Sequence, residues 1–338
     1  MNSFGRIFRI SIFGESHGEA VGILVDGCPA GLTLRPEDFQ ADLERRRGGL
    51  QKGTTPRQED DVPIFISGVF NDFTTGAPIL IKFENKNARS ADYEKMRAVP
   101  RPGHVDIVGG QKAGGFNDYR GGGHYSGRLT VALVAAGVVA KKGLGGEVQI
   151  SSTILEIAGE TDLGKGLQKA IDEKDSVGGI IECLVKGLPP GLGEPFFDSV
   201  ESVISHLVFS IPAVKAIEFG AGFKAARMFG SQHNDPIIDE KGSTATNHAG
   251  GVIGGISNGN ELVFRIAVKP TSSTPKEQNT INLETGKRET VSIKGRHDLC
   301  IALRVPVVLE AVTAIALCDL MMLEGRVPRV VSDADKDQ

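Results

Sequence analysis

The first half of the chain contains four short apolar runs that predict strands. The runs at 6–12 (RIFRISI) and 20–26 (AVGILVD) predict two strands, and 62–69 with 78–83 predict the two strands of a hairpin. The stretch that follows the hairpin, up to the triple glycine at 121–123, has no such pattern and is predicted to be irregular.

Two helices are predicted in the same half. In the first, at 36–47, Pro36 suits the first helical position, apolar residues four apart share a face, and Gly48 is expected to end the helix. The second, at 129–142 (LTVALVAAGVVAKK), is apolar nearly all round and is closed by basic residues and Gly143. This composition predicts a buried core helix.

The second half repeats this order. A strand is predicted at 179–186, a helix at 197–210, a hairpin at 250–268 that turns at 257–259, and a second apolar helix at 307–322.

A hexapeptide pattern links the two halves. G-x-P-x-G-L follows the strand in each, at 27–32 and 187–192. The pattern and the repeated order favour an internal duplication, with halves of about 1–145 and 146–330. No proline- or serine-rich linker separates them, so we expect a single large domain over 1–338.

Composition limits the classes of function. The 338 residues are 40% hydrophobic and 24% charged, as in an ordinary globular protein that can bury a substantial core. A net charge of −4 offers no general attraction for nucleic acid or an anionic membrane, so an anion site must come from local clusters of Arg and Lys. No signal peptide opens the chain and no uninterrupted apolar run has the length of a membrane span, so a cytoplasmic protein without nucleic-acid or membrane partners is expected.

The cysteines bear on redox and metal chemistry. Cys28, Cys183, Cys300 and Cys318 are far apart and form no C-x-x-C pair. This spacing argues against a zinc ribbon, a redox dithiol or a disulfide scaffold. We therefore expect buried free thiols in a reducing compartment and no metal site.

The segment FGESHG at 13–18 contains G-x-S-x-G, the turn that exposes the nucleophilic serine of α/β-hydrolases. That turn needs a helix after it, whereas a strand is predicted here, which disfavours Ser16 as a nucleophile. A tight turn alone would explain Gly14 and Gly18. Because such a turn has no use for His17, that histidine stays a candidate site residue.

Basic residues cluster around the end of the first helix. Arg45, Arg46 and Arg47 are consecutive, and Lys52 and Arg57 follow in a glycine- and threonine-rich loop. Compensation of the helix dipole explains one or two of these, at up to about 1 kcal/mol. Three consecutive arginines point in different directions, so a collar for a small, multiply charged anion is favoured over a solvated charge run.

A second candidate anion site precedes the first apolar helix, at 120–128 (RGGGHYSGR). Glycines let backbone N–H groups approach phosphate, and the start of a helix adds unpaired donors and partial positive charge. The segment is neither a Walker motif nor a G-x-G-x-x-G turn. An ordinary glycine-rich loop capped by Ser126 is the competing interpretation.

Three further clusters carry candidate chemistry. The run 269–273 (KPTSS) places three hydroxyls beside an ammonium, which suits phosphate, although Ser and Thr are common in any loop. The triplet 296–298 (RHD) would also fit a surface ion pair. Arg101 and His104 share a rigid turn, R-P-G-H. His17 and His104 are framed by glycine and arginine, so either is a candidate to move a proton near neutral pH.

Taken in order, these motifs resemble the chorismate synthase family over essentially the whole chain. The matching motifs are G-E-S-H-G at 14–18, D-G-x-P-x-G at 26–31, R-R-R-x-G at 45–49, R-P-G-H at 101–104, D-Y-R-G-G-G at 118–123, G-S-Q at 230–232, N-H-A-G-G at 247–251, G-G-I-S at 254–257, K-P-T-S-S at 269–273 and K-G-R-H-D at 294–298. The resemblance implies an α+β fold, a layered β-α-β sandwich built from two similar halves, and a homotetramer.

The same resemblance implies a lyase. It would convert 5-enolpyruvylshikimate 3-phosphate to chorismate and phosphate by anti-1,4-elimination, the last common step of the shikimate pathway to the aromatic amino acids. The family uses reduced FMN without net redox change, because the proton lost from the substrate is not adjacent to a carbonyl and a side-chain base alone faces a high barrier. No insertion resembling a flavin reductase domain is present, so an external reductase or other reductant is expected to supply reduced FMN; the resemblance also associates the chain with NADP.

The resemblance assigns roles to residues of this chain. His17 would protonate the departing phosphate, His104 would protonate the reduced flavin, and Asp298, Ser16 and Ser126 would form a proton relay. The residues implied to bind substrate carboxylates and phosphate are Arg46, Lys52, Arg101 and Arg128. The residues implied to bind FMN are His124, Tyr125, Ser126, Pro212, Ala213, Gly254, Lys269, Pro270, Thr271, Ser272, Ser273 and Arg296.

The chain departs from the family's usual form at two places. After the triple glycine it has H-Y-S-G-R-L-T instead of R-S-S-A-R-E-T, which keeps Ser126 and Arg128 and predicts activity with altered affinity for FMN or substrate. Lys52 stands where an arginine is frequent, which keeps the charge but loses bidentate geometry. The competing hypotheses are a serine hydrolase or phosphatase that uses Ser16, and a non-catalytic FMN- or phosphate-binding protein.

Overall fold

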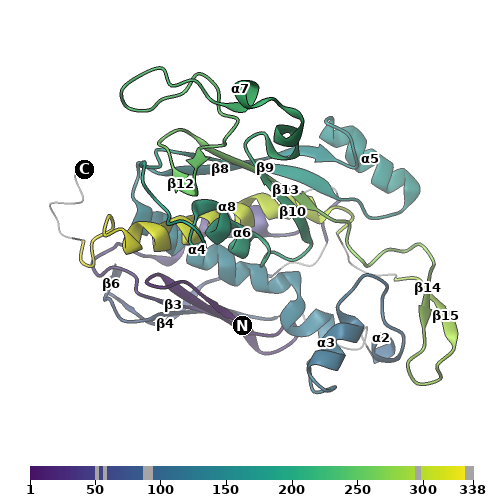
Figure 1. The fold of residues 1–338 in the computed structure, drawn as a ribbon. Helices are drawn as coiled ribbons and strands as arrows, with labels where there is room; N and C mark the ends of the chain where they lie inside the picture. The colour runs from purple at the N-terminus through teal and green to yellow at the C-terminus, as the bar shows by residue number, and fades with distance from the viewer. Residues whose placement is uncertain (50–52, 56–58, 87–93, 294–297, 332–338) are drawn as a thin grey trace.

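Every second side chain is buried along the central strands, so each sheet turns one face to a core. Burial alternates through β13 (Leu262–Val268) and through most of β7 (Ile79–Glu84). The computed structural model describes residues 1–49, 53–55, 59–86, 94–293 and 298–331. In it two antiparallel sheets lie on either side of a layer of helices (Figure 1), which confirms the predicted α+β sandwich.

The first sheet comes from the N-terminal half. Its strands lie in the order β1 (Ser3–Phe4), β2 (Arg9–Gly14), β3 (Ala20–Asp26), β7 and β4 (Ile64–Ser67), with antiparallel neighbours throughout. All four strands predicted from this half are present. A small ribbon, β5 (Val69–Phe70) with β6 (Phe73–Thr74), is inserted between β4 and β7.

The second sheet comes from the C-terminal half. Its order is β10 (Val214–Phe219), β13, β9 (Gly179–Lys186) and β8 (Gln149–Ile157), again antiparallel. The strand predicted at 179–186 is confirmed, whereas β8 and β10 were not predicted.

The predicted hairpin at 250–268 is wrong. β13 pairs with β9 and β10, and the residues before it form a separate ribbon of β11 (Val252–Ile253) and β12 (Ile256–Ser257). The chain reverses at Gly254 and Gly255, whose φ values of 62° and 84° suit glycine, and therefore earlier than at 257–259.

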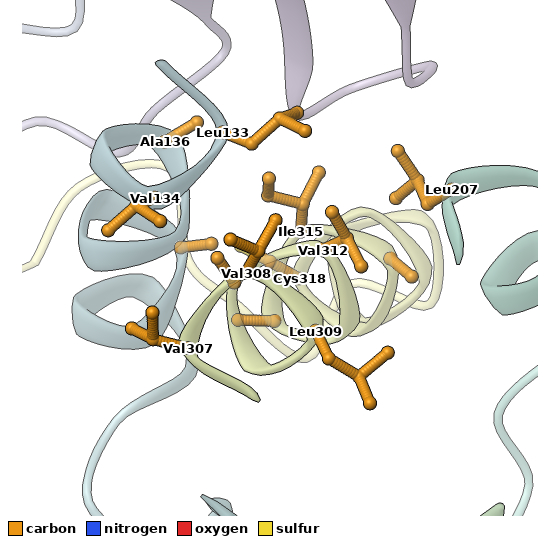
Figure 2. Close-up of a cluster of buried hydrophobic side chains, with 14 of the residues drawn as sticks. Leu133, Val134, Ala136, Leu207, Val307, Val308, Leu309, Val312, Ile315 and Cys318 are labelled. Carbon is orange, nitrogen blue, oxygen red and sulfur yellow. The ribbon is translucent and has the colours of Figure 1, made fainter. Parts of the chain in front are cut away.

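Three helices fill the middle layer. They are α4 (Thr130–Leu144), α6 (Val200–Val208) and α8 (Val305–Leu323), and Figure 2 shows their apolar side chains meeting between the sheets. α4 and α8 touch closely, because a Cβ at Gly137 would lie 2.3 Å from the Cβ of Ala311. The predicted apolar helices are confirmed, but α4 runs through Gly143 and ends at Leu144, before Gly145, which has a φ of 78°.

By length and composition, the helical stretch Ile301–Leu323 would also satisfy the requirements of a membrane span. Its most apolar window is 78% buried inside the protein, as the central helix of a sandwich must be. The sequence was expected to contain no uninterrupted apolar run of that length. Two buried acidic residues, Glu310 and Asp319, do interrupt this one.

The helix predicted at 36–47 has two parts. Pro36–Phe39 is a 3-10 turn, and α1 (Gln40–Arg46) continues it. Arg47 is already extended, with a ψ of 139°, so the helix ends at Arg46, one residue earlier than predicted.

The two halves share more than their order of elements. Strand order β2-β3-β7-β4 in one sheet corresponds to β8-β9-β13-β10 in the other. Both G-x-P-x-G-L turns are closed by a hydroxyl that donates to the proline carbonyl and accepts from the leucine N–H, namely Thr74 in the first half and Ser257 in the second. These parallels are what a duplication would leave, and the internal duplication stays a prediction.

The remaining described helices and strands surround this sandwich. They are α2 (Glu94–Ala98), α3 (Asp106–Lys112), α5 (Leu163–Glu173), α7 (Gly230–His233), β14 (Gln278–Ile281) and β15 (Arg288–Val291). α2 and α3 fall within the stretch that was predicted to be irregular. They lie at the end of the sandwich where the β14–β15 ribbon projects (Figure 1).

Candidate active site

One cavity of about 480 Å³ lies at the amino ends of the two longest core helices. The residues that line it at these ends are Gly127, Arg128 and Thr130 near the start of α4, and Ile301, Arg304, Val305 and Val308 near the start of α8. Its size is that of pockets that hold small molecules. Because the amino end of a helix carries partial positive charge and unpaired N–H groups, the fold itself favours an anion here.

Among the described residues, six cationic side chains line this cavity, against three carboxylates. The cations are Arg46, Arg47, Arg101, Arg128, Lys269 and Arg304, and the carboxylates are Glu59, Asp61 and Asp298. The chain as a whole has a net charge of −4, so the positive potential here arises from local clustering.

The buried carboxylate of Asp61 holds two of these arginines. Its Oδ2 accepts a hydrogen bond from Arg46 Nη2 at 2.7 Å, and its Oδ1 accepts one from Arg128 Nη1. Burial opposes ionisation of Asp61, but the charges of Arg46 and Arg128 outweigh it and lower the pKa of the carboxyl. One carboxylate shared by two guanidinium groups leaves a net positive charge at the cavity wall.

The three consecutive arginines point in different directions, as expected for a helix end. Arg45 forms a bidentate pair with Glu310 of α8, with both N–O distances at 2.7 Å. Arg46 and Arg47 line the cavity, and Arg47 Nη2 donates to the carbonyl of Asp60 at 2.6 Å. Arg45 therefore anchors α1 to α8, while Arg46 and Arg47 form part of the cavity wall.

The loop before α3 forms a second charged unit. Asp106 accepts hydrogen bonds from Arg101 Nε and Nη2, both at 2.8 Å, and lies 2.5 Å from His104 Nδ1. Arg101 Nη1 also donates to Ser273 Oγ at 3.1 Å. Arg101 and His104 line the cavity, so Asp106 supports two predicted site residues from behind.

The triple glycine places its backbone against His17. Gly121, Gly122 and Gly123 have φ values of 60°, 82° and 54°, a region that side-chain-bearing residues rarely adopt. A Cβ at Gly121 would lie 2.5 Å from Cδ2 of His17 and 3.0 Å from Oγ of Ser16. Gly121 lines the cavity, so the missing side chain lets both residues lie directly behind the cavity wall.

Ser16 is not placed as a hydrolase nucleophile. It is fully buried, and its N–H donates to the carbonyl of Gly123 at 3.1 Å. The strand β3 follows it, instead of the helix that a nucleophile turn requires. His17, at 8% exposure, is also behind the wall and not among the lining residues.

The residues that depart from the family's usual form divide between two environments. Tyr125 lines the cavity at 43% exposure and lies against Gly109 of α3. His124 is not a lining residue, and its Nδ1 lies 2.8 Å from the carbonyl oxygen of Gly14. Ser126 lines the cavity and also accepts a hydrogen bond from the N–H of Arg128, so the capping interpretation holds as well.

Most residues predicted to bind FMN meet in this cavity. Its lining includes Pro212, Ala213, Lys269, Pro270, Thr271, Ser272 and Ser273. Lys269 Nζ and Ser272 Oγ donate to the carbonyl of Gly103 at 3.0 and 2.7 Å, which ties this segment to the loop before α3. Gly254 lies in the turn between β11 and β12 and does not line the cavity. Lys52 and Arg296 lie outside the described residues, as do Arg57 and His297.

Asp298 lines the cavity beside Arg304. Its Oδ2 lies 3.1 Å from Arg304 Nη1, and its Oδ1 accepts the N–H of Thr55 at 2.8 Å. Arg304 Nε donates to the carbonyl of Arg46 at 2.8 Å, so this pair joins the start of α8 to the end of α1.

Four residues that support the site were missed by sequence reasoning: Asp61, Asn85, Asp106 and Arg304. Asn85 Nδ2 donates to the carbonyls of Glu15 and Gly18, and its Oδ1 accepts from Arg128 Nε at 3.0 Å. A signal existed for Asp106, which follows His104 by two residues. No local pattern marks Asp61 or Asn85, because their partner Arg128 is distant in sequence, and Arg304 lies six residues after Asp298 without a recognised motif.

No described group of three or more His, Cys, Asp or Glu residues is arranged to hold a metal ion. All four cysteines are free and buried, as predicted. Burial raises the pKa of the Cys28 and Cys183 thiols to about 12, which fits inert core thiols.

Comparison with known proteins decides the family. A family model described as chorismate synthase matches residues 8–322. This chain belongs to the chorismate synthase family. The chorismate synthase of Chitinophaga pinensis is 68% identical over 98% of this chain and 99% of its own length. That of Archaeoglobus fulgidus is 43% identical over 97% and 99%.

A solved structure agrees with these relatives. A crystal structure of chorismate synthase superposes with a TM-score of 0.72 and 26% identity, and covers 95% of this chain and 93% of its own. The resemblance recognised from the sequence motifs is therefore confirmed. As a chorismate synthase, the chain is a lyase, and the hydrolase hypothesis is wrong.

Proposed function

We propose that this chain eliminates phosphate from 5-enolpyruvylshikimate 3-phosphate to give chorismate, the last common step of the shikimate pathway to the aromatic amino acids. The observation that carries the proposal is the cationic cavity at the amino ends of α4 and α8. The substrate bears two carboxylates and a phosphate, and a ligand with that charge accounts for a wall so rich in arginine.

The arginines of the first half are assigned to the substrate. Arg46 and Arg128 are held by Asp61, and Arg101 is held by Asp106. Because these guanidinium groups are ordered before the substrate arrives, binding immobilises fewer side chains and costs less entropy.

His17 is assigned as the acid for the leaving group. It lies behind Gly121, and the absence of a side chain at that glycine lets the imidazole lie close to the cavity wall. A proton delivered to a phosphate oxygen lowers the charge of the departing group and so makes it a better leaving group. Ser16, Ser126 and Asp298 are assigned to the proton relay.

The described residues fit reduced FMN as the cofactor. Lys269 with the hydroxyls of the 271–273 segment suits a phosphate, and Pro212 and Ala213 offer an apolar edge. When bound, reduced FMN supplies transient electron donation that no side chain offers. An external reductant is assigned to keep the flavin reduced, with NADP as the associated nicotinamide cofactor.

The proposal extends to a cytoplasmic homotetramer. Within the stretch 196–237, five large apolar side chains are each more than 70% exposed, and a partner subunit would cover them: Phe196, Phe197, Phe223, Phe229 and Ile237. The free, buried cysteines suit a reducing compartment.

An anaerobic assay with 5-enolpyruvylshikimate 3-phosphate and photoreduced FMN tests the reaction. We expect chorismate absorbance and an equal amount of phosphate with reduced flavin, and neither product with oxidised flavin. Phosphate release without flavin would contradict the proposed flavin-dependent elimination. FMN binding without turnover would support a non-catalytic flavin-binding protein.

A further inference from the structure

Two neighbours compete for one ring nitrogen of His104. Nδ1 lies 2.5 Å from Oδ1 of Asp106 and 3.0 Å from Nη2 of Arg101. A guanidinium group only donates hydrogen bonds, and an ionised carboxylate only accepts them. Nδ1 must therefore carry a proton to satisfy Asp106, or present a lone pair to satisfy Arg101.

The contacts favour the hydrogen bond from Nδ1 to the carboxylate of Asp106. Burial opposes ionisation of Asp106, but hydrogen bonds from Arg101 and His104 outweigh it and hold the pKa of the carboxyl well below its usual range. Nη2 of Arg101 already has a partner in Oδ1 of Asp106, at 2.8 Å. The shorter contact of His104 with the same oxygen needs a proton between the two atoms, and that proton belongs on Nδ1.

The other ring nitrogen, Nε2, then keeps its lone pair in the neutral ring. His104 is a lining residue, whereas Asp106 is not. Beside the ring is Gly122, where a Cβ would lie 3.6 Å from Cε1 and 3.8 Å from Nε2, so the backbone of the triple glycine lies close to this edge of the imidazole.

We propose that Asp106 is a positioning residue for the reaction, which fixes His104 as the Nδ1–H tautomer and leaves Nε2 as the atom that exchanges protons with a bound molecule. The catalytic half of this inference rests on the proposed function. The tautomer itself does not, because it follows from the contacts of the ligand-free protein.

The proton transfer balances without any further group. In the imidazolium both ring nitrogens carry a proton. Nε2 gives its proton to the acceptor and keeps the electron pair of the N–H bond, while Nδ1 keeps its proton on Asp106. A proton from water then restores the imidazolium.

Asp106→Asn changes this balance with little change of shape. The amide can turn its NH₂ group toward Nδ1, and Arg101 can donate there as well, so the neutral ring would carry its proton on Nε2. In that tautomer Nε2 no longer accepts a proton. An Asp-to-Asn change beside a catalytic histidine of the serine-protease triad acts in the same way.

The tautomer is tested by NMR of the full chain with ¹⁵N-labelled histidine, without substrate or flavin. The His104→Gln spectrum identifies the His104 signals. We expect Nδ1–H in the neutral ring of the native protein, a shift toward Nε2–H in Asp106→Asn, and recovery of Nδ1–H in Asp106→Glu. An Nε2–H ring in the native protein, or no change in Asp106→Asn, overturns the proposal.

Steady-state kinetics test the catalytic consequence. We expect Asp106→Asn to lower kcat roughly 10- to 100-fold, and the double variant with His104→Gln to lose no more than His104→Gln alone. Additive losses would mean that Asp106 acts through another group and would contradict the proposal. Matched thermal unfolding of Asp106→Asn and Asp106→Glu separates a fold defect from a tautomer defect.

Asp106 also holds Arg101, and Ser273→Ala separates that role. This variant removes the hydrogen bond of Arg101 to Ser273 and leaves the pair of His104 and Asp106 intact. We expect it to raise KM for substrate and to leave the His104 tautomer unchanged; a changed tautomer would count against the proposal. If the native chain turned over no substrate, the proposed function would fail while the NMR result still decided the tautomer.

Discussion

Two carboxylates, Asp61 and Asp106, each organise a pair of cavity groups. Asp61 holds Arg46 and Arg128, and Asp106 holds Arg101 together with His104. A single acidic side chain can fix two neighbours because its two oxygens accept in different directions. Removing Asp61 would leave Arg46 and Arg128 without their shared counter-charge, and removing Asp106 would leave Arg101 without its ion-pair partner.

At the same scale, His17→Gln tests the assignment of the acid. Glutamine keeps hydrogen-bonding capacity at this position but cannot supply a proton near neutral pH. We expect kcat to fall by roughly 100- to 10,000-fold, with KM changed far less because the arginines still hold the substrate. Kinetics with reduced flavin measure both constants.

His206→Gln is the matched control for that experiment. His206 belongs to α6 and contacts Phe4, outside the lining of the cavity. We expect this variant to keep native kinetics, and native turnover in His17→Gln would refute the acid assignment.

At the scale of elements, the contact of α4 with α8 sets the spacing of the whole middle layer. Gly137 of α4 packs directly against Ala311 of α8, and α8 itself is buried along nearly its whole length. Close packing in a core leaves little room for added atoms, so this contact depends on the absence of a side chain.

Gly137→Ala should therefore destabilise the protein despite alanine's better helix propensity. The new Cβ would lie 2.3 Å from Cβ and 2.5 Å from Cα of Ala311, and a backbone atom cannot move aside alone. We expect a loss of about 1–3 kcal/mol in the free energy of unfolding, measured by denaturant titration.

Gly143→Ala in the same helix is the control. Its Cβ would meet only the Sγ of Cys318, at 3.2 Å. Helix propensity favours alanine by about 1 kcal/mol, which should offset that tighter contact. If both variants were equally stable, close approach at Gly137 would not limit the packing.

Local patterns predicted the elements whose signal lies within one segment. The two apolar helices and the strand β3 are long runs of apolar residues, and all three are where the pattern placed them. The hairpin at 250–268 failed because β13 pairs with β9, whose residues lie far back in the chain. Its apolar alternation predicts a strand but says nothing of the partner.

The same limit applies to the candidate site. His17 and His104 were recognisable because glycine and arginine frame them in sequence. Asp61 and Asn85 were not, because their roles depend on Arg128, which reaches them only through the fold. Sequence reasoning thus identified the groups assigned to the chemistry but missed most of those that hold them.

At the scale of the whole molecule, the cavity requires both halves. Arg45 of α1 pairs with Glu310 of α8, and Arg101 donates to Ser273. Lys269 in turn donates to the carbonyl of Gly103. These contacts join residues on opposite sides of the proposed boundary near position 145, so neither half alone encloses the site.

The buried ion pairs also set the response of the whole fold to acid. In Asp61, Asp106 and Glu310, burial raises the pKa of the carboxyl, but neighbouring arginines lower it by a larger amount. Each folded pKa therefore lies below its unfolded value of about 4. The unfolded chain then binds protons more readily, and the stabilisation present above about pH 4 is lost as pH falls through the folded values.

We therefore expect the unfolding temperature, measured by circular dichroism, to fall steeply below about pH 4. Asp61→Asn should be less stable at neutral pH and lose less on acidification, because it lacks one of the three groups. An unfolding temperature that stayed constant down to pH 3 would show that these carboxylates do not control acid stability.

The matching turns closed by Thr74 and Ser257 have a consequence for the origin of the site. If the halves descend from one ancestral gene, that ancestor would have formed a symmetric pair, with the same residues on both walls of its binding cleft. Fusion of two copies would then have freed the walls to diverge. The present asymmetry, with all three predicted substrate arginines before position 145 and the 269–273 segment after it, would be the result of that divergence.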